Sequence, residues 1–334
     1  MSNANEEKLK QYQGLRAVAF LSVFFCHVTL LTKIDTWGVA VFFVLSGFLM
    51  TLRHLEDPEV TKIQGFRGCF AFTLRHVKKF YPLYLVTLLS AAAAEVIRDQ
   101  EILIAGMPLS ALRLLIRMVT NILLITDWIR FPFLYEFQEF NIVTWFLSAL
   151  AVYWLLTPVI LRFLRKLKSG KSIVLVGVIA YTVQCLVVSL LIILLGGSSW
   201  RLVYQHPLLR LGDYFSGCVC GCVAQELRKD GRKTTLRKKE WLSVGVVLCN
   251  VLSCIATFQI SAAELYSNEV YFTVPICLLI LVLTDDESLL TKVLFWKPLV
   301  ALGDLSGNAF LIHVVVINYM HAIYKRIFNL NSRV

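Results

Sequence analysis

Apolar residues gather in long runs separated by short polar segments, and this alternation continues along almost the whole chain. Most runs approach the roughly 20 residues that a helix needs to cross the hydrocarbon core of a membrane. The pattern predicts an all-α fold, a polytopic bundle of membrane helices. The nine strongest runs cover residues 15–31, 37–52, 80–97, 142–161, 173–195, 208–227, 241–258, 270–283 and 299–324.

A tenth, weaker apolar segment covers residues 109–128 and is interrupted by four polar or charged residues. If it does not span and the N-terminus is cytoplasmic, 23 of the 33 lysines and arginines lie on the cytoplasmic side. If it spans, the basic loops RFLRKLKSGK and LRKDGRKTTLRKK face outward, against the positive-inside bias. We therefore predict nine spans and one re-entrant or interfacial helix.

Composition supports the membrane interpretation and limits the other classes. The 334 residues are 57% hydrophobic and 16% charged, with a mean hydropathy of +0.69. A soluble domain carries about 25% charged residues. The length leaves no room for a soluble domain, so residues 1–334 are expected to form one integral-membrane domain. The first run lacks a small-residue cleavage site after it, so we expect a retained span rather than a signal peptide.

The net charge of +11 would indicate nucleic-acid binding in a soluble protein. Here the basic residues lie mainly in loops, so topology explains them and we expect no nucleic-acid partner. Most of the nine cysteines lie inside apolar runs. Cys218, Cys220 and Cys222 alternate around a helix and do not converge on one ion. Neither a metal site nor a disulfide framework is expected.

Ionisable residues inside apolar runs are functional candidates because burying them in a membrane is costly. Arg16 and His27 lie eleven residues apart, which places them on one helix face about 16 Å apart. A histidine can accept and return a proton near neutral pH. The alternatives are a snorkelling, topology-setting arginine and a hydrogen-bonded packing histidine.

Two further features have both functional and structural interpretations. Ser46 and Gly47 form a small polar step within the second run, which fits helix packing at least as well as a catalytic serine. Arg75, His76, Lys78 and Lys79 are expected to lie in the loop that enters the third run and form a basic cluster able to hold phosphate. Orientation in the membrane alone also explains this cluster.

Six segments, in order over residues 11–313, resemble the membrane acyltransferase-three family of enzymes that acylate extracytoplasmic glycans. The first three are QYQGLRAVAFLSVFFCH, WGVAVFFVLSGFL and the basic cluster leading to Pro82. The others are TWFLSALAVYWLLTP, PLLRLGDYFSG and SGNAFLIH. Two departures stand out. The family's paired arginines are replaced by Arg75 with Lys78 or His76 with Lys79. Leu150 stands where many members have glutamate.

The resemblance implies that Arg16 and His27 are catalytic, with His27 as general base, and that the basic cluster binds coenzyme A phosphates. It implies acyl-CoA, most simply acetyl-CoA, as donor and no metal. The acceptor is then a hydroxyl of an exported or lipid-linked glycan. Five residues become candidate substrate contacts: Ser46, Trp145, Arg210, Asp213 and His313. For Arg210 and Asp213 a local ion pair is the alternative, and for His313 packing is the alternative.

The sequence therefore predicts a multi-pass O-acyltransferase of the cell membrane with a cytoplasmic N-terminus. Direct transfer and an acyl-enzyme route both stay open, as do the acyl group, the sugar and the oligomeric state. A second hypothesis is a transporter with an Arg16 and His27 proton relay, but the chain shows no paired inverted halves. A third is a structural partner of a glycan-assembly complex.

Overall fold

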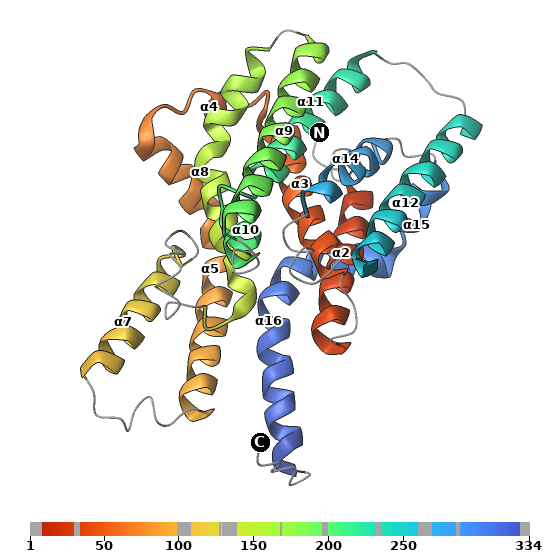
Figure 1. Cartoon of the computed structure of the whole chain (residues 1–334). Coiled ribbons are helices and arrows are strands. Elements are labelled where there is room, and N and C mark those ends of the chain that lie inside the picture. The colour runs from red at the N-terminus through yellow and green to blue at the C-terminus, as the bar shows by residue number, and fades with distance from the viewer. Residues whose placement is uncertain are drawn as a thin grey trace.

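The computed structural model describes residues 9–29, 34–98, 108–126, 128, 139–167, 169–195, 200–230, 236–259, 269–284 and 288–327. Throughout these ranges the regular structure is helical (Figure 1). The α-helices are α2 (Lys10–Thr29), α3 (Asp35–His54), α4 (Pro58–Thr61), α5 (Gly65–Arg98), α7 (Pro108–Ile122), α8 (Trp145–Arg165), α9 (Gly170–Leu195), α10 (Trp200–Gln205), α11 (Leu211–Asp230), α12 (Leu236–Gln259), α14 (Thr273–Val282), α15 (Leu289–Leu294) and α16 (Lys297–Ile327). Two 3₁₀ turns, η1 (Ile142–Thr144) and η3 (Glu269–Phe272), precede α8 and α14.

Every apolar run of the sequence forms a helix, so the predicted all-α fold is confirmed. Within the described ranges, five helices are long and apolar enough to cross a membrane: Asp35–His54, Ile142–Arg165, Gly170–Leu195, Arg237–Phe258 and Lys297–Tyr324. The chain is thus a multi-pass membrane protein. The ten residues of α14 extend only about 15 Å, half of the hydrocarbon core. The total of nine spans stays a prediction.

The weak tenth segment forms the amphipathic helix α7, whose 15 residues reach only about 22 Å. It lies beside the end of α5, at the same end of the bundle as the last turns of α16, whereas α4 lies at the opposite end (Figure 1). Arg117 of α7 forms a two-pronged ion pair with Glu95 of α5 and lies 4.0 Å from the centre of the Phe140 ring. The arginine that interrupts the apolar pattern therefore fixes α7 against α5.

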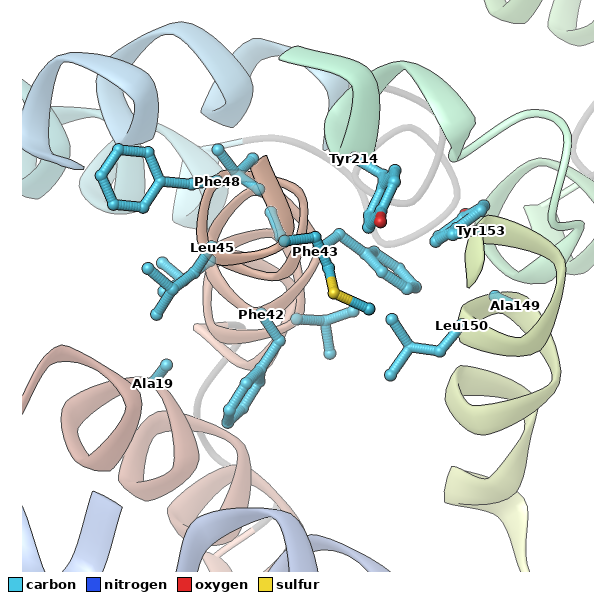
Figure 2. Close-up of a cluster of buried hydrophobic side chains, with 14 of the residues drawn as sticks. Ala19, Phe42, Phe43, Leu45, Phe48, Ala149, Leu150, Tyr153 and Tyr214 are labelled. Atoms are coloured by element: carbon cyan, nitrogen blue, oxygen red, sulfur yellow. The ribbon is translucent and has the colours of Figure 1, made fainter. Parts of the chain in front are cut away.

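The core is built around α3, which packs against α2 on one side and α11 on the other. Contact with α11 is close because two glycines face backbone. A Cβ atom on Gly217 would lie 1.9 Å from the Val44 carbonyl oxygen, and one on Gly47 would lie 2.0 Å from that of Tyr214. Figure 2 shows Phe42 pointing from α3 toward α2, while Phe43 faces Tyr153 and Tyr214. The packing interpretation of Gly47 is therefore correct.

One local expectation is wrong. The basic cluster is not in a loop, because α5 begins at Gly65 and runs without a break through Lys79 and on past Pro82. The reason is an amphipathic pattern of helical period: Cys69, Phe72 and Val77 are buried, while Arg75 and Lys78 are exposed. The many basic residues of this segment make its helical period hard to recognise in the sequence. The basic side chains are consequently sorted by helix face rather than gathered in one flexible loop.

Candidate active site

A cavity of about 250 Å³ lies between α2, α3, α5, α8 and α16. Its walls are mainly apolar, and several come from aromatic side chains. Phe80 of α5 and Trp154 of α8 stack almost parallel, with ring centres 6.3 Å apart. Since five helices that range from α2 to α16 each contribute side chains, the cavity is a product of the tertiary fold. The remaining lining residues are Leu9, Gln13, Arg16, Phe42, Leu45, Ser46, Leu49, Met50, Arg53, His76, Lys79, Phe146, Leu147, Leu150, Gly307, Phe310 and Leu311.

Three basic side chains, Arg16, Arg53 and Lys79, line this cavity together with His76. The guanidinium of Arg16 donates to the side-chain oxygen of Gln13 at 3.5 Å. It lies against α16 at Gly307, where a side chain would contact it. A cationic, partly enclosed wall of this kind suits a phosphorylated ligand.

His76 precedes the apolar run of α5, and its Nδ1 donates to the Phe72 carbonyl at 2.9 Å. Burial, reinforced by the nearby charges of Lys79 and Arg53, lowers the pKa of His76 below its usual range. The side chain is therefore neutral at pH 7 and offers a hydrogen bond rather than a charge. The positive charge on the cavity wall comes from the lysine and the two arginines.

The basic cluster divides into two faces. His76 and Lys79 line the cavity, whereas Arg75 and Lys78 are exposed on the outer side of α5. Arg53, at the cytoplasmic end of α3 in the predicted topology, completes the cationic wall and was missed by the sequence analysis. Helical spacing could have identified it, because Ser46 and Arg53 lie seven residues, or two turns, apart on one face of α3.

Ser46 lines the cavity, and its hydroxyl donates to the Phe42 carbonyl at 2.6 Å. This bond satisfies the hydroxyl within its own helix, an arrangement common for serine in membrane helices. Ser46 gives the wall a small polar surface between Arg16 and the aromatic end of the cavity. Leu150, where many members of the resembled family have glutamate, also lines it.

His27 lies near the end of α2 and forms a pair with His313 of α16. The ring centres are 5.0 Å apart and the rings are nearly perpendicular. Nδ1 of His27 donates to the Val23 carbonyl at 2.9 Å, and Nδ1 of His313 donates to that of Phe310 at 2.8 Å. The carbonyls only accept, so in the neutral form of each ring Nε2 carries the lone pair. Nε2 of His313 is buried without a hydrogen bond to the described residues.

Asp35, at the start of α3, is a further acidic group near His27. Its buried carboxyl group lies close to the Cys26 thiol and the His27 imidazole. The sequence analysis missed it. Its position in the sequence could have identified it, because α3 begins only a few residues after α2 ends. Asp35 at the start of α3 is therefore close to His27 near the end of α2.

Trp145, Arg210 and Asp213 lie away from the cavity. Trp145 is buried against Phe43 and Tyr204. The guanidinium of Arg210 lies 5.4 Å from the centre of the same Phe43 ring, and its Nε forms an ion pair with the Asp213 carboxylate at 2.8 Å. These residues form a buried cluster that joins α8 to α11. Among the described residues, no group of three His, Cys, Asp or Glu side chains is arranged as metal ligands.

A membrane-embedded bundle with a cationic cavity and a nearby histidine pair fits an enzyme that handles a phosphorylated acyl donor. The comparison with protein families agrees. Residues 9–332 match the acyltransferase-three family model, described as an acyltransferase domain. The chain belongs to this family of acyltransferases, which confirms the resemblance and the enzyme class.

Curated relatives point to the same class. The chain is 27% identical to the acyltransferase MdmB of Streptomyces mycarofaciens, over 94% of this chain and 80% of that protein. It is 25% identical to the putative peptidoglycan O-acetyltransferase YrhL of Bacillus subtilis, over 91% of this chain and 48% of the relative. It is 24% identical to the putative O-acetyltransferase SA0834 of Staphylococcus aureus. The chain spans about half the length of the two O-acetyltransferases. No solved structure matches it. The chain is a membrane acyltransferase.

Proposed function

We propose that this enzyme transfers an acyl group, most simply acetyl, from cytoplasmic acyl-CoA to a hydroxyl of an exported or lipid-linked glycan at the cell membrane. The observation that carries the proposal is the cavity whose wall presents Arg16, Arg53 and Lys79 in a chain of an acyltransferase family. The transporter hypothesis loses its support, because relatives over nine-tenths of the chain are named acyltransferases.

The donor enters from the cytoplasmic side in this proposal, since the N-terminus and the basic loops lie there by the positive-inside bias. Lys79 and Arg53 hold the phosphates with charge-assisted hydrogen bonds. From Arg53 to Phe42 along α3 is eleven residues, about 16 Å, which accommodates an extended pantetheine arm along the apolar wall. Arg16 lies beside this path and orients the thioester end.

His27 is the general base. Its Nε2 removes the proton of the acceptor hydroxyl while that oxygen attacks the thioester carbonyl carbon. The carbon–sulfur bond breaks, and the coenzyme A thiolate recovers the proton from the imidazolium. The His313 ring packs against the His27 ring, with ring centres 5.0 Å apart, and helps to fix its orientation. Because Ser46 is bonded within its own helix, direct transfer is preferred to an acyl-enzyme.

The acceptor approaches from the outer face, where α2 ends two residues beyond His27. One relative is named for peptidoglycan O-acetylation, so a cell-envelope glycan is the proposed acceptor class. Trp145, Arg210 and Asp213 lie away from the donor cavity and are better explained as a structural cluster than as donor contacts. Single-domain organisation over residues 1–334 is part of the same proposal.

The proposed function can be tested by asking from which side of the membrane the enzyme accepts its donor. We expect inverted vesicles from the organism that carries this chain to release coenzyme A from labelled acetyl-CoA and to acylate an envelope glycan. Intact right-side-out vesicles are expected to do neither, because the donor does not cross the bilayer. A strain without the gene provides the background, and mass spectrometry of its surface glycan should show the loss of one acyl unit per modified sugar. Equal release with and without the gene would rule the proposal out.

Two neighbouring lysines on α5 allow a test of whether the basic cluster binds the donor phosphates or only orients the chain in the membrane. Lys79→Ala is expected to raise the KM for acetyl-CoA about 10-fold, equivalent to about 1.4 kcal/mol, because Lys79 lines the cavity. Lys78→Ala removes the same charge from the preceding residue, which is also exposed but does not line the cavity, and should change KM less than about twofold. Initial rates in inverted vesicles over a range of donor concentrations measure both. Equal changes would mean that only the net charge of the cluster matters.

A further inference from the structure

Three phenylalanine rings from three different helices close one end of the cavity. Phe42 of α3, Phe146 of α8 and Phe310 of α16 have ring centres 5.9, 5.8 and 5.2 Å apart, and all three line the cavity. Phe42 and Phe310 are only 6% and 5% exposed. Aromatic rings at these separations are in direct contact. We call this group the phenylalanine triangle.

The triangle lies between the cationic part of the cavity and the histidine pair. On α3 the wall runs from Arg53 to Phe42, so the triangle is at the end opposite Arg53. On α16, Phe310 precedes His313 by less than one turn, and their ring centres are 5.7 Å apart. His27, which is not among the lining residues, contacts His313 in turn. A donor held in the cavity therefore reaches the histidines only past these rings.

We propose that the phenylalanine triangle restricts the acyl group to short chains, an inference that rests on the acyl transfer proposed above. The terminal acyl group is the part of the donor that meets the triangle when the thioester carbonyl approaches His27. Close-packed interiors resist added methylenes, because neighbouring side chains leave their preferred rotamers. Each extra methylene in such a confined apolar site commonly changes selectivity 10-fold or more. Acetyl fits beside the rings, and longer chains displace them.

Phe146 is the informative position for a test. It is the most exposed of the three residues and lines the cavity. Its ring contacts are with Phe42, Phe43, Trp145 and Phe310 rather than with a histidine. Truncating it enlarges the closed end without removing a group that contacts the proposed base.

A competition experiment measures acyl selectivity independently of how much variant protein is folded. Inverted vesicles from the deletion strain, complemented with the wild-type or variant chain, receive equimolar acetyl-, butyryl- and hexanoyl-CoA. Mass spectrometry then follows consumption of each thioester. The wild type should consume acetyl-CoA at least about 10-fold faster than hexanoyl-CoA. Phe146→Ala should raise the hexanoyl-to-acetyl ratio about 10-fold or more.

Phe146→Leu is a milder variant that keeps an apolar side chain and should shift the ratio in the same direction. Phe258→Ala, on the exposed face of α12, is the matched control and should leave the ratio unchanged. If the wild type consumes acetyl-CoA but neither Phe146 variant changes the ratio, or if the wild type already accepts hexanoyl-CoA equally, the triangle does not select chain length. If the wild type consumes none of the three thioesters above the deletion background, the proposed function itself is wrong.

Discussion

Replacing His27 with glutamine is expected to reduce acyl transfer by 10²- to 10⁴-fold, the contribution typical of a general base. This loss corresponds to about 3–5.5 kcal/mol of transition-state stabilisation. Glutamine keeps a side chain that can donate to the Val23 carbonyl, as Nδ1 of His27 does, but it cannot accept a proton at neutral pH. Donor binding should be unaffected because the cavity that holds Arg16 and Lys79 does not include His27. The initial rate of coenzyme A release at saturating acetyl-CoA measures the effect.

His321→Gln is the matched control for this variant. His321 lies on the same helix as His313 but further along it, and its side chain is exposed. It should retain nearly full activity, and both variants should elute as single monodisperse species in detergent. A His27→Gln protein that is well folded and keeps more than a tenth of the wild-type rate would exclude His27 as the base and favour its packing role.

The sequence predicted the helices well because their signal is local. Runs of apolar residues of the right length determine which segments become helices in a membrane, and each predicted run corresponds to one. The exception is α5, where Arg75 and Lys78 were taken to indicate a loop. Within that segment the buried positions recur with the helical period, and this weaker signal is the correct one.

The site was only partly predictable. Helical spacing shows which residues share one face of a helix, but not which other helices that face packs against. The eleven-residue spacing of Arg16 and His27 correctly indicates one helix, but only the fold shows that the cavity holds Arg16 without His27. Arg53 shares a helix face with Ser46, but its membership of the cavity depends on how α3 packs in the bundle. The pairing of His27 with His313 joins the two ends of the chain, and no local pattern contains it.

Asp213 shows most clearly how a functional motif can have a structural role. It is 1% exposed and Arg210 is 3% exposed. Its carboxylate forms an ion pair with Arg210 at 2.8 Å and accepts hydrogen bonds from Thr273 at 2.6 Å and from Gln184 at 3.3 Å. One acidic group therefore joins α11 to α9 and α14. Such a network is costly to interrupt because each partner is left buried without its acceptor.

Asp213→Leu is therefore expected to lower the free energy of unfolding by about 3–5 kcal/mol, since it leaves the Arg210 cation buried and uncompensated. This is a large share of the roughly 5–15 kcal/mol that stabilises a typical domain. The melting temperature in detergent, followed by size-exclusion chromatography after heating, measures the loss. Arg210→Met combined with Asp213→Leu removes both charges and should recover part of it, because apolar side chains can replace a buried ion pair. If Asp213→Leu instead melts like the wild type and loses only acyl transfer, the pair contacts the acceptor rather than supporting the fold.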